Sequence, residues 1–394
     1  MLNFKHEGEL YHDIMASKSE QLTSKELLEQ VLKCLNTLIT FKENQLQKSE
    51  HYKQEIENTV NLIFEFLVKI LTEEGLWNES EENVKATARR ILEISLLTHL
   101  QFDSNWAKPS FHNEIHILAV ICAFLEILPT LRHDDIFAIE NTLNTWNHES
   151  EISESSTSPI TSGEFALAMI MALATHDLGN ILQEIQEQEG ENPKAIFHEV
   201  YNAEGAEERS QAIASVLITK FNQAVDEAKI KQIIGLVQHL IEQTKFQPIP
   251  SIESKQTPWW FLIQIIDQIG GNMVLLSTEL LEEPACTKPN YYVSAVAGLI
   301  IEIFQAGRDK PINLDDFLNF IAPRLKILVP EEEKANEILA LLSNQQFNLL
   351  ASHLNQANKN NFAHIVEILK KVFPNRQVSV YTNETNQTFL TISQ

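Results

Sequence analysis

One short segment of the sequence carries two side chains of a metal-binding type. Residues 111–116 contain His112 and His116, and a spacing of four places both on one face of a helix. Imidazole and carboxylate groups are ligands for Zn, Fe and Mn, and with more oxygen or water also for Mg. The segment is therefore a candidate half of a metal site.

A second candidate is the adjacent pair His176 and Asp177, which follows the apolar run of residues 165–174. A carboxylate buried beside apolar side chains is costly unless it is paired or bound to a metal. The alternative is that the pair lies in solvent at a helix C-terminus. Downstream, Asp267 follows a buried-looking helical pattern and is the preferred further ligand, whereas Asp226 stands in a polar stretch.

The elements that must position these residues are predicted to be helices. Only 11 glycines and 13 prolines interrupt the chain, and most segments between them repeat apolar residues at intervals of three and four, so the fold is predicted to be all-α. Thr23 with Glu26, and Thr161 with Glu164, form capping boxes. The predicted helices cover residues 23–35, 51–74, 80–96, 110–128, 134–146, 161–175, 194–202, 206–221, 226–243 and 259–270, with further helices up to about residue 373.

Local signals predict where some of these elements begin and end. Ser110 is expected to cap the helix with His112 and His116, and Gly75 to end the helix of residues 51–74. The predicted irregular segments are an exposed loop at 147–162 and a linker at 248–258. Residues 377–381 and 388–392 alternate in polarity and predict a small C-terminal β-hairpin, an edge addition to the helical body.

Charge and composition limit the kinds of binding partner and the cellular compartment that we expect for this chain. The net charge is −24, from 30 basic and 54 acidic residues, so a nucleic-acid polymer is not expected to bind, and a small phosphate compound would need bound cations. Three widely spaced cysteines without a CxxC pattern predict a reducing cytoplasm rather than a disulfide framework. No apolar run reaches eighteen residues and the first nine residues lack a secretion signal, so neither a membrane span nor a signal peptide is expected.

Both segments resemble motifs of one known family. Phe111–His116 is similar to the Tyr-His-Asn-x-x-His motif, and Ala174–Asn180 to the Ala-x-x-His-Asp-φ-Gly pattern, of the HD-domain metal-dependent phosphohydrolase superfamily. This superfamily includes cyclic-nucleotide phosphodiesterases and HD-GYP enzymes. Residues 207–212 are a weaker echo of the Glu-x-Ser-Ala helix of bacterial HD proteins. The resemblance covers about residues 106–272 and implies a multi-helical, phosphodiesterase-like bundle.

The resemblance also implies roles for the matching residues. His116, His176, Asp177 and Asp267 would bind a first divalent ion (Mg, Mn, Fe, Zn or Ni), and Asp177 would bridge to a second. His112 would be the catalytic histidine that protonates the leaving alcohol, a role that suits imidazole because it titrates near neutral pH. A metal-activated water would attack the phosphorus, with Asp177 contributing to catalysis as the bridging ligand.

Departures from the family pattern concern the second ion. Three residues after the Asp of the pair, phosphodiesterases place a histidine and HD-GYP proteins a lysine, whereas this chain has Asn180. His198 and His239 are candidate second-metal ligands, and the alternative for each is a structural role on an apolar helix. Asn113 and Asn180 are candidates for supporting the metal ligands. Phe111 stands in place of the motif's tyrosine, and no GYP-like motif is present.

The leading hypothesis is a metal-dependent phosphodiesterase acting on a small phosphorylated or nucleotide-like substrate. The alternatives are a catalytically degenerate HD-fold binding or scaffold protein with a protein partner, and a phosphodiesterase acting on a protein-linked phosphodiester. The resemblance extends to such domains in secreted effectors of intracellular bacteria. Three regions are predicted: an N-terminal helical cap at 1–105, an HD-type catalytic core at 106–275 and a C-terminal helical region at 276–394 that ends in the hairpin.

Overall fold

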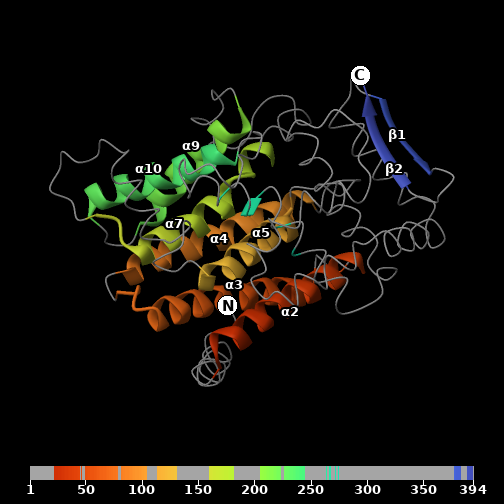
Figure 1. Ribbon diagram of the computed structural model, residues 1–394. Helices are drawn as coiled ribbons and strands as arrows, with labels where there is room; N and C mark the ends of the chain where they lie inside the picture. The colour runs from red at the N-terminus through yellow and green to blue at the C-terminus, as the bar shows by residue number, and fades with distance from the viewer. Residues whose placement is uncertain are drawn as a thin grey trace, which may run out of the picture.

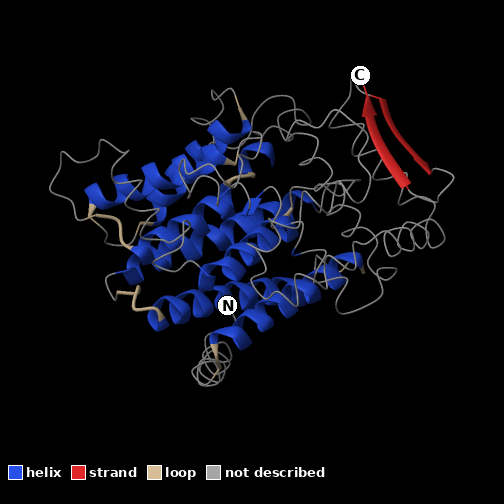
Figure 2. Ribbon diagram, viewed as in Figure 1, coloured by secondary structure: helices blue, strands red, loops and turns tan. Residues whose placement is uncertain are grey.

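The computed structural model describes a helical body and a terminal pair of strands (Figures 1 and 2). Within this part, the chain forms seven α-helices and one short 3-10 helix, which confirms the predicted helical class for these residues. No helix among them is long and apolar enough to cross a membrane. The described residues are 22–44, 46, 49–78, 81–103, 113–130, 159–181, 205–222, 226–244, 263, 266–267, 271, 274, 377–382 and 388–393.

The helices pack as two outer pairs around a central group. The outer pairs are α2 with α3, and α9 with α10, while α4, α5 and α7 lie between them and contact one another. Figure 1 shows this order, with α2 and α3 at one side of the body and α9 and α10 at the other. The bounds are α2 Ser24–Glu43, α3 Glu50–Glu73, α4 Glu82–Asp103, α5 Glu114–Ile127, η2 Leu128–Thr130, α7 Ser162–Thr175, α9 Ala206–Phe221 and α10 Glu227–Gln243.

Several helix ends lie where the local sequence predicts them. Both capping boxes form: Thr23 caps α2 with Glu26 reaching back to its backbone, and Thr161 caps α7 with Glu164 in the same arrangement. Gly75 follows α3 with a φ of +71°, the left-handed conformation that glycine adopts without a steric penalty. The bounds of α9 and α10 also agree with the predicted ranges 206–221 and 226–243.

The central helices α5 and α7 are the elements that carry the histidine segments. All 14 residues of α5 are buried, as are residues 163–175 of α7. Apolar side chains on nearly every face of both helices explain this, because such a helix is stable only when other elements surround it. Phe124 of α5 and Phe165 of α7 are among the largest fully buried side chains. His116 and the pair His176 and Asp177 therefore stand on, or directly after, helices that are buried along their length.

Two strands lie near the C-terminus. β1 (Gln377–Thr382) and β2 (Thr388–Ser393) pair antiparallel, with Val380 opposite Leu390. Their place as an edge addition to the helical body stays a prediction. The following predictions concern residues outside the described ones: the helices at 134–146 and 194–202, the loop at 147–158, the linker at 248–258, the helices after 275, and the boundaries at 105/106 and 275/276.

Candidate metal centre

α5 holds His116 in its first turn. The helix is capped by Asn113, whose Oδ1 accepts hydrogen bonds from the backbone N–H groups of Ile115 at 2.9 Å and His116 at 3.2 Å. The prediction that Ser110 caps this helix is therefore wrong. Asn113 is extended, with φ −136° and ψ 178°, so the helix begins after it. Asn113 supports the site by fixing the start of α5.

His112 precedes this cap and lies outside the described residues. The prediction that His112 and His116 share one helix face is wrong, because α5 begins at Glu114, two residues after His112. The role of His112 as a proton donor stays a prediction. His198, a candidate second-metal ligand, also lies outside the described residues.

α7 ends at the pair His176 and Asp177. His176 is the C-cap residue, Asp177 follows it in a turn, and each is only 4% exposed, so the alternative of a solvated pair is wrong. His176 Nδ1 lies 2.8 Å from the carbonyl oxygen of Leu173. Because a carbonyl oxygen can only accept, Nδ1 carries the hydrogen and donates it. This contact leaves Nε2 of His176 facing the site as a potential metal ligand.

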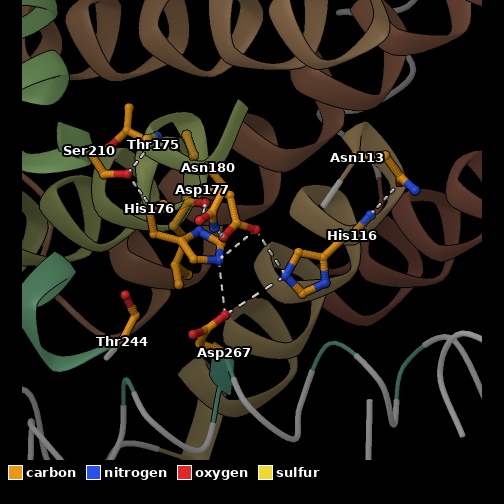
Figure 3. A network of polar contacts seen from close by, with 12 residues as sticks. Asn113, His116, Thr175, His176, Asp177, Asn180, Ser210, Thr244 and Asp267 are labelled. Atoms are coloured by element: carbon orange, nitrogen blue, oxygen red, sulfur yellow. Dashed lines mark hydrogen bonds and ion pairs between the residues drawn. The ribbon is translucent and has the colours of Figure 1, made fainter. Parts of the chain in front are cut away.

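Asp267, which has a π-helical conformation together with Ile266, lies beside the two histidines. Its Oδ1 lies 2.9 Å from Nε2 of His176 and 3.9 Å from Nε2 of His116. Asp177 Oδ2 lies 3.2 Å and 3.3 Å from the same two nitrogens. Figure 3 shows the two imidazole rings directed toward one another, with the Asp177 and Asp267 carboxylates on either side. Four side chains from three separate segments therefore converge on one small volume.

This arrangement suits a divalent ion. Donor atoms that share one ion at about 2.0–2.2 Å stand about 3.0–3.5 Å from their neighbours. Three of the four nitrogen–oxygen distances lie at or near that spacing, at 2.9, 3.2 and 3.3 Å, and the fourth is 3.9 Å. His116, His176 and Asp267 each offer a ligand atom within 4.8 Å of the other two, so the group could hold a metal ion. When both imidazoles are neutral, as metal ligation requires, the two carboxylates give the site a formal charge of about −2, which a divalent cation neutralises.

The same charges act on a proton when no metal is bound. Burial is the largest single influence and lowers the pKa of His176, whereas the negative charges of Asp177 and Asp267 raise it. Hydrogen bonds to Asp267 and Leu173 add to the rise, and the pKa of His176 reaches about 10, against an ordinary value of 6.5. The site thus favours positive charge at the position of Nε2.

The start of α9 holds the turn after α7 in place. Ser210 Oγ donates to the carbonyl oxygen of His176 at 2.5 Å and accepts from the backbone N–H of Gly179 at 2.9 Å. Arg209 Nε donates to the carbonyl oxygen of Gly179 at 3.2 Å. Ser210 and Arg209 are both buried, so these bonds are shielded from water. The backbone on both sides of Asp177 is consequently fixed by α9.

Gly179 is required by a close approach of two backbones. A Cβ at this position would overlap the carbonyl oxygen of Ala206 in the first turn of α9. Sequence reasoning missed the contacts of Gly179 and Ser210. The glycine of the His-Asp pattern and the serine in segment 207–212 were the available signals, but the two residues are 31 positions apart and local patterns do not predict such a pairing.

Sequence reasoning also missed a buried acidic residue at the start of α5. Glu114 is fully buried, and its Oε1 accepts from Lys42 Nζ of α2 at 2.8 Å and from the Tyr52 hydroxyl of α3 at 2.7 Å. The available signal was a glutamate inside an otherwise apolar helix, where a carboxylate needs partners. The contacts attach α2 and α3 to the helix that carries His116.

The remaining candidate residues, Asn180 and His239, differ in whether they contact the candidate metal centre. Asn180 Nδ2 donates to Asp177 Oδ1 at 3.1 Å, so this side chain contacts the candidate centre. His239 lies on α10 and is not part of the group with His116 among the described residues; its Nε2 lies 3.4 Å from the side-chain nitrogen of Gln243. Burial lowers the pKa of His239, and the negative charge of Glu242 offsets part of this decrease.

Asp226, the alternative to Asp267, has a structural position. It is exposed and caps α10, with its Oδ1 accepting from the backbone N–H of Ala228 at 3.5 Å. Of these two aspartates, Asp267 is the one that lies beside the histidines.

Comparisons with known proteins assign no family to this chain. No protein-family model matches the chain, and neither the curated proteins nor the solved structures gave a significant match.

Proposed function

We propose that this chain is a divalent-metal-dependent phosphohydrolase, specifically a phosphodiesterase that acts on a small phosphorylated or nucleotide-like substrate. The single observation that carries the proposal is the convergence of the buried His116 and His176 with Asp267, with Asp177 in contact with both imidazoles. The resemblance of the two histidine segments to HD-domain phosphohydrolases supports the reaction class.

The charge of the protein supports a metal-assisted reaction over one that relies on basic side chains. With a net charge of −24, the average field repels an anionic phosphate ester. Asp177 and Asp267 would repel it further unless a cation lies between them and the substrate. A divalent ion, when bound, would reverse this local charge and lower the pKa of a coordinated water.

The chain's own residues prepare this site. Leu173 fixes the tautomer of His176, so Nε2 faces the carboxylates. Ser210 and Gly179 hold the backbone around Asp177, which limits the movement of its carboxylate. In this proposal His112, two residues before the start of α5, donates a proton to the leaving oxygen.

A second candidate is an HD-fold binding protein without catalysis. It is favoured by Asn180, which stands where the resembling enzymes carry a histidine or a lysine and donates to Asp177 Oδ1. This candidate predicts a site that binds a nucleotide or a protein partner, with that binding intact when metal ligands are replaced. Loss of such binding on replacing His116 would contradict it. The third hypothesis, cleavage of a protein-linked phosphodiester, differs from the first only in substrate, and a screen of modified proteins would test it.

The proposal is tested with the purified 394-residue chain. Elemental analysis after reconstitution with Mn, Fe, Zn, Ni or Mg should find a bound ion, and the loaded protein should hydrolyse bis(p-nitrophenyl) phosphate or p-nitrophenyl phosphate. His176→Ala should weaken metal binding and turnover by about 100-fold or more, because even the loss of a residue that only supports a ligand costs about 10–100-fold.

His239→Ala is the matched control, since it removes a partly buried histidine from a helix outside the candidate centre. It should retain both the metal and the activity. A protein that stays metal-free after reconstitution, or turnover that is unchanged in His176→Ala, would overturn the proposed function. Circular dichroism of both variants checks that the helical fold remains.

A further inference from the structure

The two carboxylate oxygens of Asp177 have different surroundings. Oδ2 lies 3.3 Å from Nε2 of His116 and 3.2 Å from Nε2 of His176, inside the candidate centre. Oδ1 accepts a hydrogen bond from Nδ2 of Asn180 at 3.1 Å. Because a carboxylate oxygen can only accept, the amide nitrogen rather than the amide oxygen must face it. One oxygen of Asp177 is thus directed to the metal-binding group and the other is held by an amide.

Asn180 is itself held in this position. Its backbone N–H donates to the carbonyl oxygen of Asp177 at 3.0 Å, so main chain and side chain both bond to the same residue. The close contact of Gly179 with the first turn of α9 fixes the intervening backbone. The backbone of Asn180 is thereby held at a place from which its side-chain amide reaches Asp177.

We propose that this chain binds a single divalent ion, and that Asn180 excludes a second one by occupying Oδ1 of Asp177. The inference rests on the proposed metal-dependent function and specifies the stoichiometry of the same site. In two-metal sites the ions lie about 3.5–4 Å apart, close enough for one carboxylate to place an oxygen on each. Here Oδ1 of Asp177 faces the N–H group of the Asn180 amide, whose partial positive charge repels a cation.

The single-ion arrangement divides the roles of the nearby residues. His116, His176 and Asp267 hold the ion together with Oδ2 of Asp177, and Asn180 acts as a positioning residue that orients this carboxylate. The attack on a phosphate would then depend on one ion and on proton transfer by protein side chains. A substrate phosphate receives less neutralising charge here than in a two-ion site, so a phosphodiester, with one negative charge, is favoured over a dianionic phosphomonoester.

The test counts the ions bound per chain. Wild-type protein, Asn180→Asp and Asn44→Asp are each saturated with Mn²⁺, and the bound ions are counted by native mass spectrometry. Asn180→Asp replaces the donor by a carboxylate of similar size, and two carboxylates about 3 Å apart repel one another unless a cation joins them. Asn44 is the matched control, because it also follows a helix and its amide donates to a carbonyl oxygen, of Thr40 at 2.8 Å.

We expect one ion in the wild type, two in Asn180→Asp and one in Asn44→Asp. Two ions in the wild type would overturn this inference but leave the proposed function standing. No ion in the wild type would overturn the proposed function and this inference with it. One ion in Asn180→Asp, with the helical content unchanged, would show that Asn180 does not exclude the second ion and would overturn the inference.

Discussion

Lys42 and Glu114 form a buried ion pair across 72 positions of sequence, with 2.8 Å between Nζ and Oε1. Their side chains are 5% and 0% exposed, and Tyr52 donates to the same oxygen. Glu114 opens α5, so the pair attaches the N-terminal helices to the helix that carries His116. The negative charge of Glu114 also lies at the N-terminus of α5, where the helix dipole favours it.

Lys42→Met should destabilise the protein by about 3–5 kcal/mol near pH 7, because the variant leaves the Glu114 carboxylate buried without its counter-charge. Chemical denaturation followed by circular dichroism measures the change. Lys53→Met is the control: this lysine forms an exposed pair of similar length, 2.9 Å, with Glu50, so its removal should change stability little. Similar effects from the two variants would contradict the structural role of the buried pair.

Metal affinity should rise with pH. His176 must lose the proton from Nε2 to bind an ion, and the pKa of His176 in the metal-free protein is about 10. Below that value each bound ion displaces one proton, so the affinity should increase about tenfold per pH unit. Competition of Mn²⁺ between the protein and a chelator from pH 6 to 8.5 measures the slope. A pH-independent affinity would contradict a metal-free His176 that is protonated in this range.

Gly179→Ala should destabilise the protein and weaken metal binding together. The new methyl group would overlap the backbone oxygen of Ala206, and relief of this overlap requires α9 to move away from the turn. Such overpacking typically costs about 1–3 kcal/mol. Thermal unfolding and a Mn²⁺ titration measure both effects.

Gly235→Ala is the matched control for this substitution. Gly235 lies within α10, and a Cβ there would meet nothing within 4 Å. Its replacement should stabilise the protein by about 0.5–1 kcal/mol, since alanine loses less conformational freedom in a helix. The prediction fails if Gly179→Ala behaves like Gly235→Ala.

Asn113→Ala should lower stability by about 0.5–2 kcal/mol, because the N–H groups of Ile115 and His116 lose their acceptor. Asn113→Ser should retain most of the stability, as serine is a comparable cap. Metal stoichiometry should remain unchanged in both variants, because Asn113 acts through the start of α5. Loss of the ion from Asn113→Ser with the fold intact would instead indicate direct involvement in the site.

Much of the helical fold could be predicted from local sequence. Capping boxes such as Thr23 with Glu26 act over three residues, and Gly75 ends α3 through its own backbone conformation. The start of α5 was predicted wrongly because Ser110 and Asn113 are both good caps, and nothing within the segment selects between them. Local signals therefore defined helices well where a single cap was available.

The sequence by itself determined which side chains could bind a metal: two histidine segments, and an aspartate on an apolar helix. Only the tertiary structure decided that His116, His176 and Asp267 meet, that Asn180 takes one oxygen of Asp177, and that Lys42 neutralises the first residue of α5. The physical reason is range. Caps and helical periodicity act over a few residues, whereas burial, charge pairing and metal ligation join residues that only the packing of helices brings together.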